Sequence, residues 1–255
     1  MTTNPHAPRW EFYRRVVDRL IPDRSASVLV VCAGRGDKRL LEQLGFTNVT
    51  ISNLAEARED FAPFVYARED AENLSFGDDA FDYVLVHAGL HHCQSPHRAL
   101  LEMVRVCRSG ALVFEARDSL LMRVAARLGL TYEYEIEAVA RGGAGMRDTG
   151  LPNYVYRWTE REVEKMVRTY RPQVAPRIRF FYGLSLPAPD AGGRSKRIAL
   201  RVLGPFARAF VKLFPRQGNL FAFLIEKPAA SAATLHRWLE LEDGRIGLRK
   251  DARGR

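Results

Sequence analysis

The sequence predicts an α/β protein: a doubly wound, mostly parallel, seven-stranded sheet with helices on both faces and an inserted lid. Short, continuous apolar runs are typical of parallel strands that are buried on both faces, and here they alternate with segments of helical periodicity. That alternation favours one doubly wound sheet. The expected strands are residues 27–34, 48–54, 64–67, 81–89, 111–117, 178–186 and 219–227.

Helices are expected between these strands. Their apolar side chains recur at intervals of three and four, and several begin or end at residues that favour helix termini. Gly45 stops one helix, Ser95 or Pro96 begins the next, and Thr159 with Glu162 has the spacing of a capping box. The expected helical segments are residues 9–20, 34–46, 95–107 and 159–170.

The domain organisation is inferred from the places where the alternation of strands and helices is interrupted. Residues 1–228 are expected to form one domain, in which residues 118–157 are an inserted lid over the sheet. Residues 194–216 form a basic amphipathic segment, read as a helix broken at Pro205. Its apolar face is expected to join the core, and the alternative is contact with an anionic membrane surface. Residues 229–255 are expected to be a charged, partly ordered tail.

Composition and charge limit the class of protein. The chain has 255 residues, 47% of them hydrophobic, which is enough for a sizeable core. It contains neither an apolar run long enough to span a membrane nor a signal peptide, and three cysteines favour reduced thiols, so a cytoplasmic location is expected. The net charge of +9 lies entirely in residues 191–255. No nucleic-acid motif accompanies that charge, so nucleic acid is an unlikely partner.

The loop after the first strand decides among nucleotide-type ligands. In an open parallel sheet the ligand binds at the carboxyl ends of the strands. From Gly34 the loop reads GRGDKR, with Arg39 where a dinucleotide fingerprint has its third glycine, and Asp37 would repel a pyrophosphate. Nicotinamide and flavin cofactors are therefore disfavoured. The chain also lacks the phosphate-binding loop of nucleoside triphosphatases.

Three blocks in order resemble the class I (Rossmann-like) S-adenosylmethionine-dependent methyltransferases. They are VLVVCAGRG, DAENLSFGDDAFDYVLVHAGLHH and LLEMVRVCRSGALVFEA. The resemblance covers roughly residues 27–115. It implies S-adenosyl-L-methionine as the cofactor and methylation of an acceptor as the activity.

The resemblance also implies roles for individual residues. The first loop would wrap the methionine part of the cofactor, the end of the second strand would hold the ribose, and the DAENL motif would hold the adenine, with Asp70 accepting from its amino group. The implied cofactor-binding residues are Ala33, Gly34, Arg35, Gly36, Asn53, Leu54, Asp70, Ala71, Glu72, His87 and Ala88. The chain departs from the family in four places: Val30 and Asn53 replace acidic residues, Cys32 replaces the first glycine of the loop, and Arg108-Ser109-Gly110 replaces a proline–glycine turn.

The candidate catalytic residues are His92 and His91, just after the fourth expected strand. Histidine is the usual base near neutral pH, and His92 is the leading candidate for removing a proton from an acceptor hydroxyl. The alternative, that one or both rings only pack beneath the loop, is at least as well supported. No metal site is expected, because adjacent residues rarely converge on one ion and no second ligand cluster is evident.

The expected function is methyl transfer to oxygen of a small-molecule or carbohydrate acceptor, with a lipid-linked acceptor kept open by the basic segment. Aromatic residues of the lid, such as Tyr132 and Trp158, could stack on a sugar or an aromatic acceptor, although each could equally bury the lid. The rival hypothesis is a non-catalytic binding protein that retains the fold and uses its basic surface for a partner. Neither the acceptor nor the oligomeric state follows from the sequence.

Overall fold

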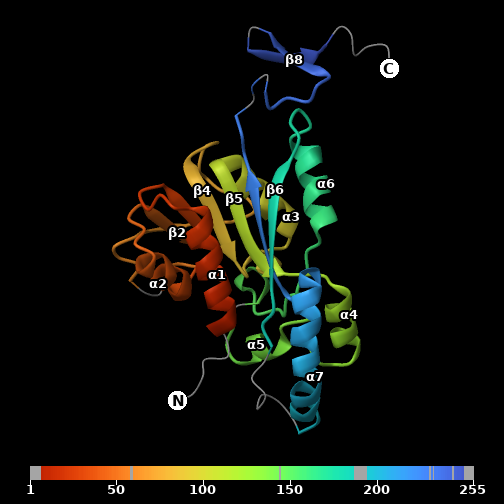
Figure 1. Ribbon diagram of the computed structural model, residues 1–255. Helices are drawn as coiled ribbons and strands as arrows, with labels where there is room; N and C mark the ends of the chain where they lie inside the picture. Colours follow the sequence, from red (N-terminus) through yellow and green to blue (C-terminus); the bar gives the residue numbers. More distant parts are fainter. Residues whose placement is uncertain are drawn as a thin grey trace.

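A computed structural model describes residues 7–57, 60–143, 145–186, 194–229, 231, 233–242 and 244–249. Its main sheet has seven strands in the order β3-β2-β1-β4-β5-β7-β6 (Figure 1). All seven expected strands form, and β7 alone runs antiparallel to its neighbours β5 and β6. The strands are β1 Val28–Val31, β2 Val49–Asn53, β3 Val65–Arg68, β4 Phe81–His87, β5 Cys107–Ala116, β6 Arg177–Gly183 and β7 Leu220–Glu226.

Helices lie on both faces of this sheet and in the lid (Figure 1). Two of them begin at side-chain caps that the sequence predicts: Ser95 accepts a hydrogen bond from the amide of Arg98, and Thr159 forms a capping box with Glu162. The α-helices are α1 Ala7–Leu20, α2 Arg35–Gln43, α3 Pro96–Val106, α4 Leu120–Arg127, α5 Ile136–Ala140, α6 Glu160–Tyr170 and α7 Arg194–Leu213. Short 3₁₀ turns are η1 Leu90–His92, η2 Met146–Asp148 and η3 Pro215–Gln217.

The core consists of two apolar layers, one on each face of the sheet. Successive side chains of a strand point to opposite faces. In β1, Val28 and Val30 therefore pack with α1 and α2, whereas Leu29 and Val31 pack with α3 and α6. Burial on both faces explains why this strand is a continuous apolar run.

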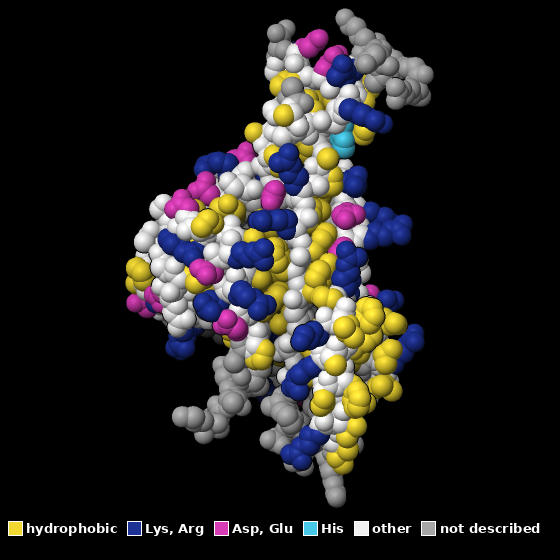
Figure 2. Space-filling model, viewed as in Figure 1, with side chains coloured by type: hydrophobic (Ala, Val, Ile, Leu, Met, Phe, Trp, Pro, Cys, Tyr) yellow, Lys and Arg dark blue, Asp and Glu magenta, His cyan; other side chains and the backbone are white. Residues whose placement is uncertain are grey.

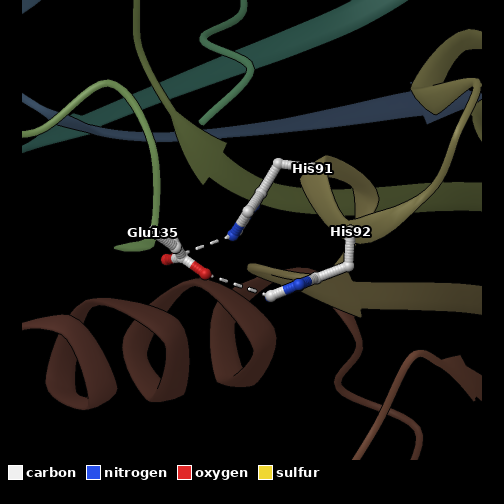
Figure 3. Close-up of side chains that lie close together, drawn as sticks. All are labelled: His91, His92 and Glu135. Carbon is white, nitrogen blue, oxygen red and sulfur yellow. Dashed lines mark ion pairs between the residues drawn. The ribbon is translucent and has the colours of Figure 1, made fainter. Parts of the chain in front are cut away.

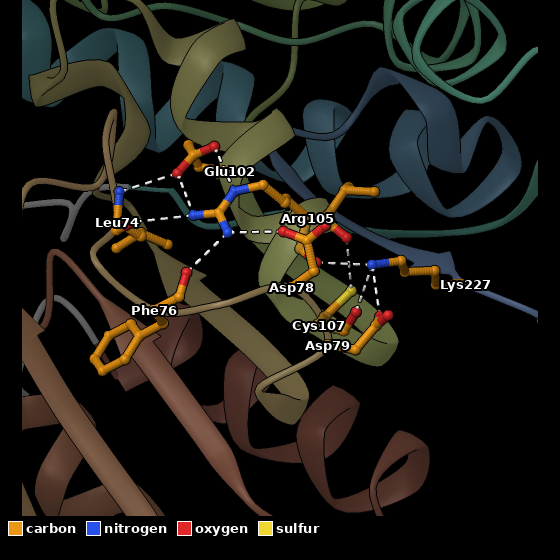
Figure 4. A network of polar contacts seen from close by, with 9 residues as sticks. Leu74, Phe76, Asp78, Asp79, Glu102, Arg105, Cys107 and Lys227 are labelled. Carbon is orange, nitrogen blue, oxygen red and sulfur yellow. Dashed lines mark hydrogen bonds and ion pairs between the residues drawn. The ribbon is translucent and has the colours of Figure 1, made fainter.

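A polar network holds the loop before β4 in place. It lies at the amino ends of the parallel strands, opposite the carboxyl ends that form the site. The Arg105 guanidinium donates to the Glu102 carboxylate and to the carbonyls of Leu74 and Phe76 (Figure 4). Lys227, just after β7, donates to the carbonyls of Arg105 and Cys107. The network joins α3, β5 and β7, and it leaves the carboxyl ends of the strands to the lid.

The basic segment differs from its expected structure in two ways. Helix α7 runs unbroken through Pro205, and most of its apolar side chains face solvent rather than the core. Phe206 is 71% exposed and Leu213 is 75% exposed, whereas Val211 is buried. The periodicity correctly indicated an amphipathic helix, but the expectation that its apolar face joins the core was wrong.

The expected tail contains local structure that the sequence did not predict. Strands β8 Leu239–Glu242 and β9 Arg245–Leu248 pair as an antiparallel hairpin. The rings of His236 and Trp238, which precede β8 in the chain, stack on each other. No helix in the described part of the chain is both long and apolar enough to cross a membrane.

Candidate functional site

A cleft of about 470 Å³ opens at the carboxyl ends of β1, β2, β3 and β4. We call it the cofactor cleft. Eight of the eleven residues assigned to the cofactor line it: Ala33, Gly34, Asn53, Leu54, Asp70, Ala71, Glu72 and Ala88. Arg35, Gly36 and His87 do not line it.

The two glycines of the first loop have different surroundings. A Cβ atom on Gly34 would meet nothing within 4 Å, so the main chain there borders open space in the cleft. A Cβ on Gly36 would lie 2.3 Å from the Trp10 ring, which packs directly on that glycine. Gly34 therefore leaves room for a ligand, whereas Gly36 leaves room for helix α1.

The end of the cleft beside Asp70 holds a cation that nothing in the sequence marks. Arg147, from η2 of the lid, pairs with Asp70 at 3.0 Å and with Glu72 at 2.9 Å. Its φ angle of 48° lies in the left-handed region. For Asp70 to accept a hydrogen bond from an adenine amino group, this guanidinium must share or release the carboxylate.

Asp37 lies behind the cleft and supports the first loop. Its Oδ2 accepts a hydrogen bond from the Gly34 amide, which is the N-cap of α2. Within the described structure, three buried polar atoms close to one another lack a hydrogen-bond partner: Asp37 Oδ1, the Tyr13 hydroxyl oxygen and His87 Nε2. Burial raises the pKa of Asp37 to about 6 and lowers the pKa of His87 to about 3.

Asp37→Asn should change how stability depends on pH. Because the folded-state pKa of Asp37 is raised, its stabilising contribution is complete below its unfolded pKa of 3.8 and is lost as pH rises through about 6. Relative to the variant, whose amide can still accept from Gly34, the native chain should lose about 2 kcal/mol between about pH 4.5 and pH 7. Urea unfolding across that range measures the difference, and parallel curves would contradict it.

A second, larger cavity of about 710 Å³ adjoins the cofactor cleft, and Ala88 lines both. We call it the acceptor cavity. Most of its lining is apolar, from α4, α7, β5 and β7, for example Phe114, Met122, Leu203 and Phe221. Its polar lining includes His87, His91, Glu115 and Glu135 near the end of β4, and also Arg9, Thr131, Arg157, Ser185 and Asn219.

The two candidate catalytic histidines converge on a carboxylate from the lid. His91 Nδ1 lies 2.8 Å from Glu115 Oε2, and its Nε2 lies 3.7 Å from Glu135 Oε1. His92 Nε2 lies 3.6 Å from the other oxygen of Glu135, and its Nδ1 lies 3.3 Å from the Gly145 carbonyl oxygen. Figure 3 shows the three side chains pointing toward one another. The sequence marked the histidines but neither Glu115 nor Glu135.

Charge differs between the two histidines. Burial alone would lower the pKa of His91, but the carboxylates of Glu115 and Glu135 outweigh it and raise the pKa to about 10. Burial and the neighbouring His91 lower the pKa of His92. In the absence of any ligand, His91 is therefore a buried imidazolium, and His92 is neutral near pH 7.

Comparison with known proteins supports one family. Residues 32–114 match the family model described as a methyltransferase domain. Together with the fold, this match supports the class I S-adenosylmethionine-dependent methyltransferase family. A curated relative, a demethylmenaquinone methyltransferase of Bacteroides fragilis, is 30% identical over 110 residues. That alignment spans 38% of this chain and 45% of the relative, less than half of its length.

Solved structures agree with the methyltransferase fold. One is a chain of the Haloferax volcanii complex that contains the Trm112 methyltransferase activator, with a TM-score of 0.56 and 14% identity over 89% of this chain and 92% of that one. Another is an S-adenosylmethionine-dependent methyltransferase of Archaeoglobus fulgidus, with a TM-score of 0.52 and 13% identity over 87% and 97% of the two chains. At these identities the likeness concerns the fold alone.

The departures of this chain from the family pattern have local structural consequences. Cys32, where the resemblance implies a glycine, adopts a φ of 52°, which an L-residue reaches only at some cost. Asn53, where the resemblance implies a carboxylate, donates to the Ala33 carbonyl and accepts from the Leu54 amide. Its side chain therefore fastens the first loop to the end of β2.

The aromatic residues in and beside the lid include some that anchor it and some that line the acceptor cavity. Trp158 is fully buried in the core, and the Tyr156 hydroxyl pairs with Glu162 of α6, so these residues anchor the lid. Tyr132 and Arg157 line the acceptor cavity, and the Arg157 guanidinium donates to the Tyr132 carbonyl. The lid therefore contributes both packing and cavity wall.

Proposed function

We propose that this chain transfers a methyl group from S-adenosylmethionine to a hydroxyl of an apolar acceptor. The observation that supports this most is that the cofactor cleft and the acceptor cavity meet at Ala88, at the end of β4. Two adjoining compartments can hold a methyl donor and an acceptor next to each other while excluding water. Holding reactants in line is the main requirement of methyl displacement.

The cleft residues suit the cofactor. The open space at Gly34 admits its methionine part, and the polar atoms of Asp70 and Glu72 lie at the opposite end for its adenine. The bound cofactor supplies an electrophilic methyl group on a sulfonium. Asn53, at the position where the resemblance implies a ribose-binding carboxylate, makes local hydrogen bonds to the backbone.

The histidine cluster accepts the proton of the acceptor hydroxyl. His91 and Glu135 line the acceptor cavity and His92 lines the cofactor cleft, so the cluster lies at the junction of the two. A hydroxyl there loses its proton to the cluster, for which His92 is the base expected from the sequence. Its oxygen bonds to the methyl carbon as the carbon–sulfur bond breaks, and the electron pair of that bond stays on sulfur.

The apolar lining favours a hydrocarbon-rich acceptor over a carbohydrate. Val124, Leu128, Leu203, Phe206 and Phe210 line the cavity and are also exposed, so the cavity opens at an apolar surface. We call this surface the α4–α7 patch. It comprises Leu120, Val124, Leu128, Ile198, Val202, Leu203, Phe206, Phe210, Leu213 and Phe214.

The α4–α7 patch has the character of a membrane-binding surface. Figure 2 shows hydrophobic side chains gathered where Figure 1 places α4 and α7. Neither helix contains Asp or Glu, and exposed cations such as Arg127, Arg208 and Lys212 flank the patch. An apolar face rimmed by cations complements an anionic bilayer, from which a lipid-like acceptor could enter the cavity directly.

Calorimetric titration of the full chain with S-adenosylmethionine tests the function and separates it from the rival, a non-catalytic protein that retains the fold. We expect one cofactor per chain, with an affinity in the micromolar range that is typical of enzyme ligands, and a rise in melting temperature. The absence of both heat and thermal shift at millimolar cofactor would favour the non-catalytic protein.

A further inference from the structure

We propose that His91, His92 and Glu135 form a binding site for one divalent transition-metal ion, such as Zn²⁺, between the cofactor cleft and the acceptor cavity. From the sequence, no metal site was expected, because adjacent residues rarely converge on one ion and no second ligand cluster was evident. The structure supplies the missing ligand from the lid. Among the residues it describes, these three side chains offer ligand atoms that all lie within 4.8 Å of one another.

The separations within the cluster suit metal ligation better than direct hydrogen bonding. The two histidine Nε2 atoms lie 3.7 and 3.6 Å from the two oxygens of Glu135. A direct N–H···O bond is shorter, about 2.7–3.2 Å. Two donor atoms that bind one tetrahedral ion at about 2.0–2.1 Å stand about 3.3–3.4 Å apart. The histidine–glutamate separations exceed that value by about 0.3 Å, and all three ligand atoms lie within 4.8 Å of one another, so the side chains must draw closer to share an ion.

The outer contacts of both histidines match those of metal ligands. Each Nδ1 faces an oxygen: Glu115 Oε2 for His91, and the Gly145 carbonyl for His92. A ligating histidine commonly donates its second ring N–H to a carboxylate or carbonyl, which fixes the tautomer and leaves Nε2 free for the metal. Here both Nε2 atoms are turned toward Glu135 (Figure 3).

Charge balance supports a cation at the same place. The Glu115 side chain is fully buried, and Glu135 is 17% exposed. Two carboxylates that share a nearly dry site are costly to bury without a cation beside them. A divalent ion with two neutral imidazoles would neutralise both carboxylates.

A metal ion held by these three side chains would have coordination positions left for an acceptor. Two histidines and one carboxylate are the protein ligands of several catalytic metal centres, in which the remaining positions bind water or substrate. Because His91 and Glu135 line the acceptor cavity, an acceptor hydroxyl could take such a position. The ion would then activate that hydroxyl in place of the free His92 ring.

Metal binding can be measured without cofactor or acceptor, so its result does not depend on the proposed function. The untagged full-length chain is stripped with a chelator and titrated with Zn²⁺ by calorimetry, and with Co²⁺ by visible absorption. We expect one ion per chain. Glu135→Gln and His92→Ala, both at partly exposed positions, should each weaken Zn²⁺ binding by about 100-fold, and Glu115→Gln by about 10-fold to 100-fold.

Two controls make the outcome decisive. His97→Ala removes a histidine that also pairs with a glutamate, Glu162, but lies outside the cluster, and it should leave affinity unchanged. Cys93→Ser removes a neighbouring thiol of the cleft and should also leave affinity unchanged. Failure of the native chain to bind either metal would overturn the proposal, as would affinity that Glu135→Gln and His92→Ala leave intact or that depends on Cys93.

Discussion

Gly34→Trp is expected to abolish S-adenosylmethionine binding while leaving the chain folded. The backbone of Gly34 has a φ of −143°, which any residue can adopt, and its missing Cβ faces open space in the cofactor cleft. An indole there would fill the space that the methionine part of the cofactor requires. We expect affinity to fall by more than about 100-fold, which corresponds to about 3 kcal/mol.

Gly77→Trp is the matched control for this variant. Gly77 is also exposed and its Cβ direction is open, but it lies outside the cleft, before β4. Both variants should unfold cooperatively near the native melting temperature, and only Gly34→Trp should lose the calorimetric signal of S-adenosylmethionine. Native affinity in Gly34→Trp would show that the cofactor does not approach this loop.

The second large effect concerns the α4–α7 patch. The native chain should co-sediment with vesicles that contain anionic phosphatidylglycerol, because Phe206 and Leu213 can enter the bilayer interface while the flanking cations contact the headgroups. Phe206→Ser with Leu213→Ser removes two of the most exposed apolar side chains and should lower partitioning by tenfold or more. Raised salt should weaken the remaining binding.

A control pair and a second readout decide what covers this patch. Val65→Ser with Leu248→Ser changes two exposed apolar residues elsewhere and should leave sedimentation unchanged. Native chain that stays in solution at low salt, or a Phe206/Leu213 variant that sediments like the control pair, would contradict membrane binding. Concentration-dependent dimerisation of the native chain, lost in the Phe206/Leu213 variant, would instead assign the patch to a second copy.

The sheet was predictable because its signals are local. Each buried parallel strand is a continuous apolar run, and caps such as Ser95 and the Thr159–Glu162 pair mark where helices begin. The surroundings of helix α7 were not predictable. Periodicity shows that a helix has an apolar face, but it does not show whether another element covers that face.

The candidate site was predictable only where it lies on the sheet. Gly34, Asn53 and Asp70 follow strands, and the topology places them together at one edge of the sheet. Arg147 and Glu135 come from the lid, whose backbone path has no periodic signal. Their contacts with Asp70 and the histidines depend on how the lid folds back over a sheet distant in sequence.

We propose that one cleft holds the cofactor with its reactive end toward the apolar cavity. A crystal structure of the full chain with S-adenosylhomocysteine tests this most directly. We expect the adenine beside Asp70, with Arg147 displaced or sharing that carboxylate, and the sulfur near Ala88, facing the acceptor cavity. A cleft that stays closed by Arg147 in saturating ligand, or a sulfur that points away from the cavity, would contradict the account.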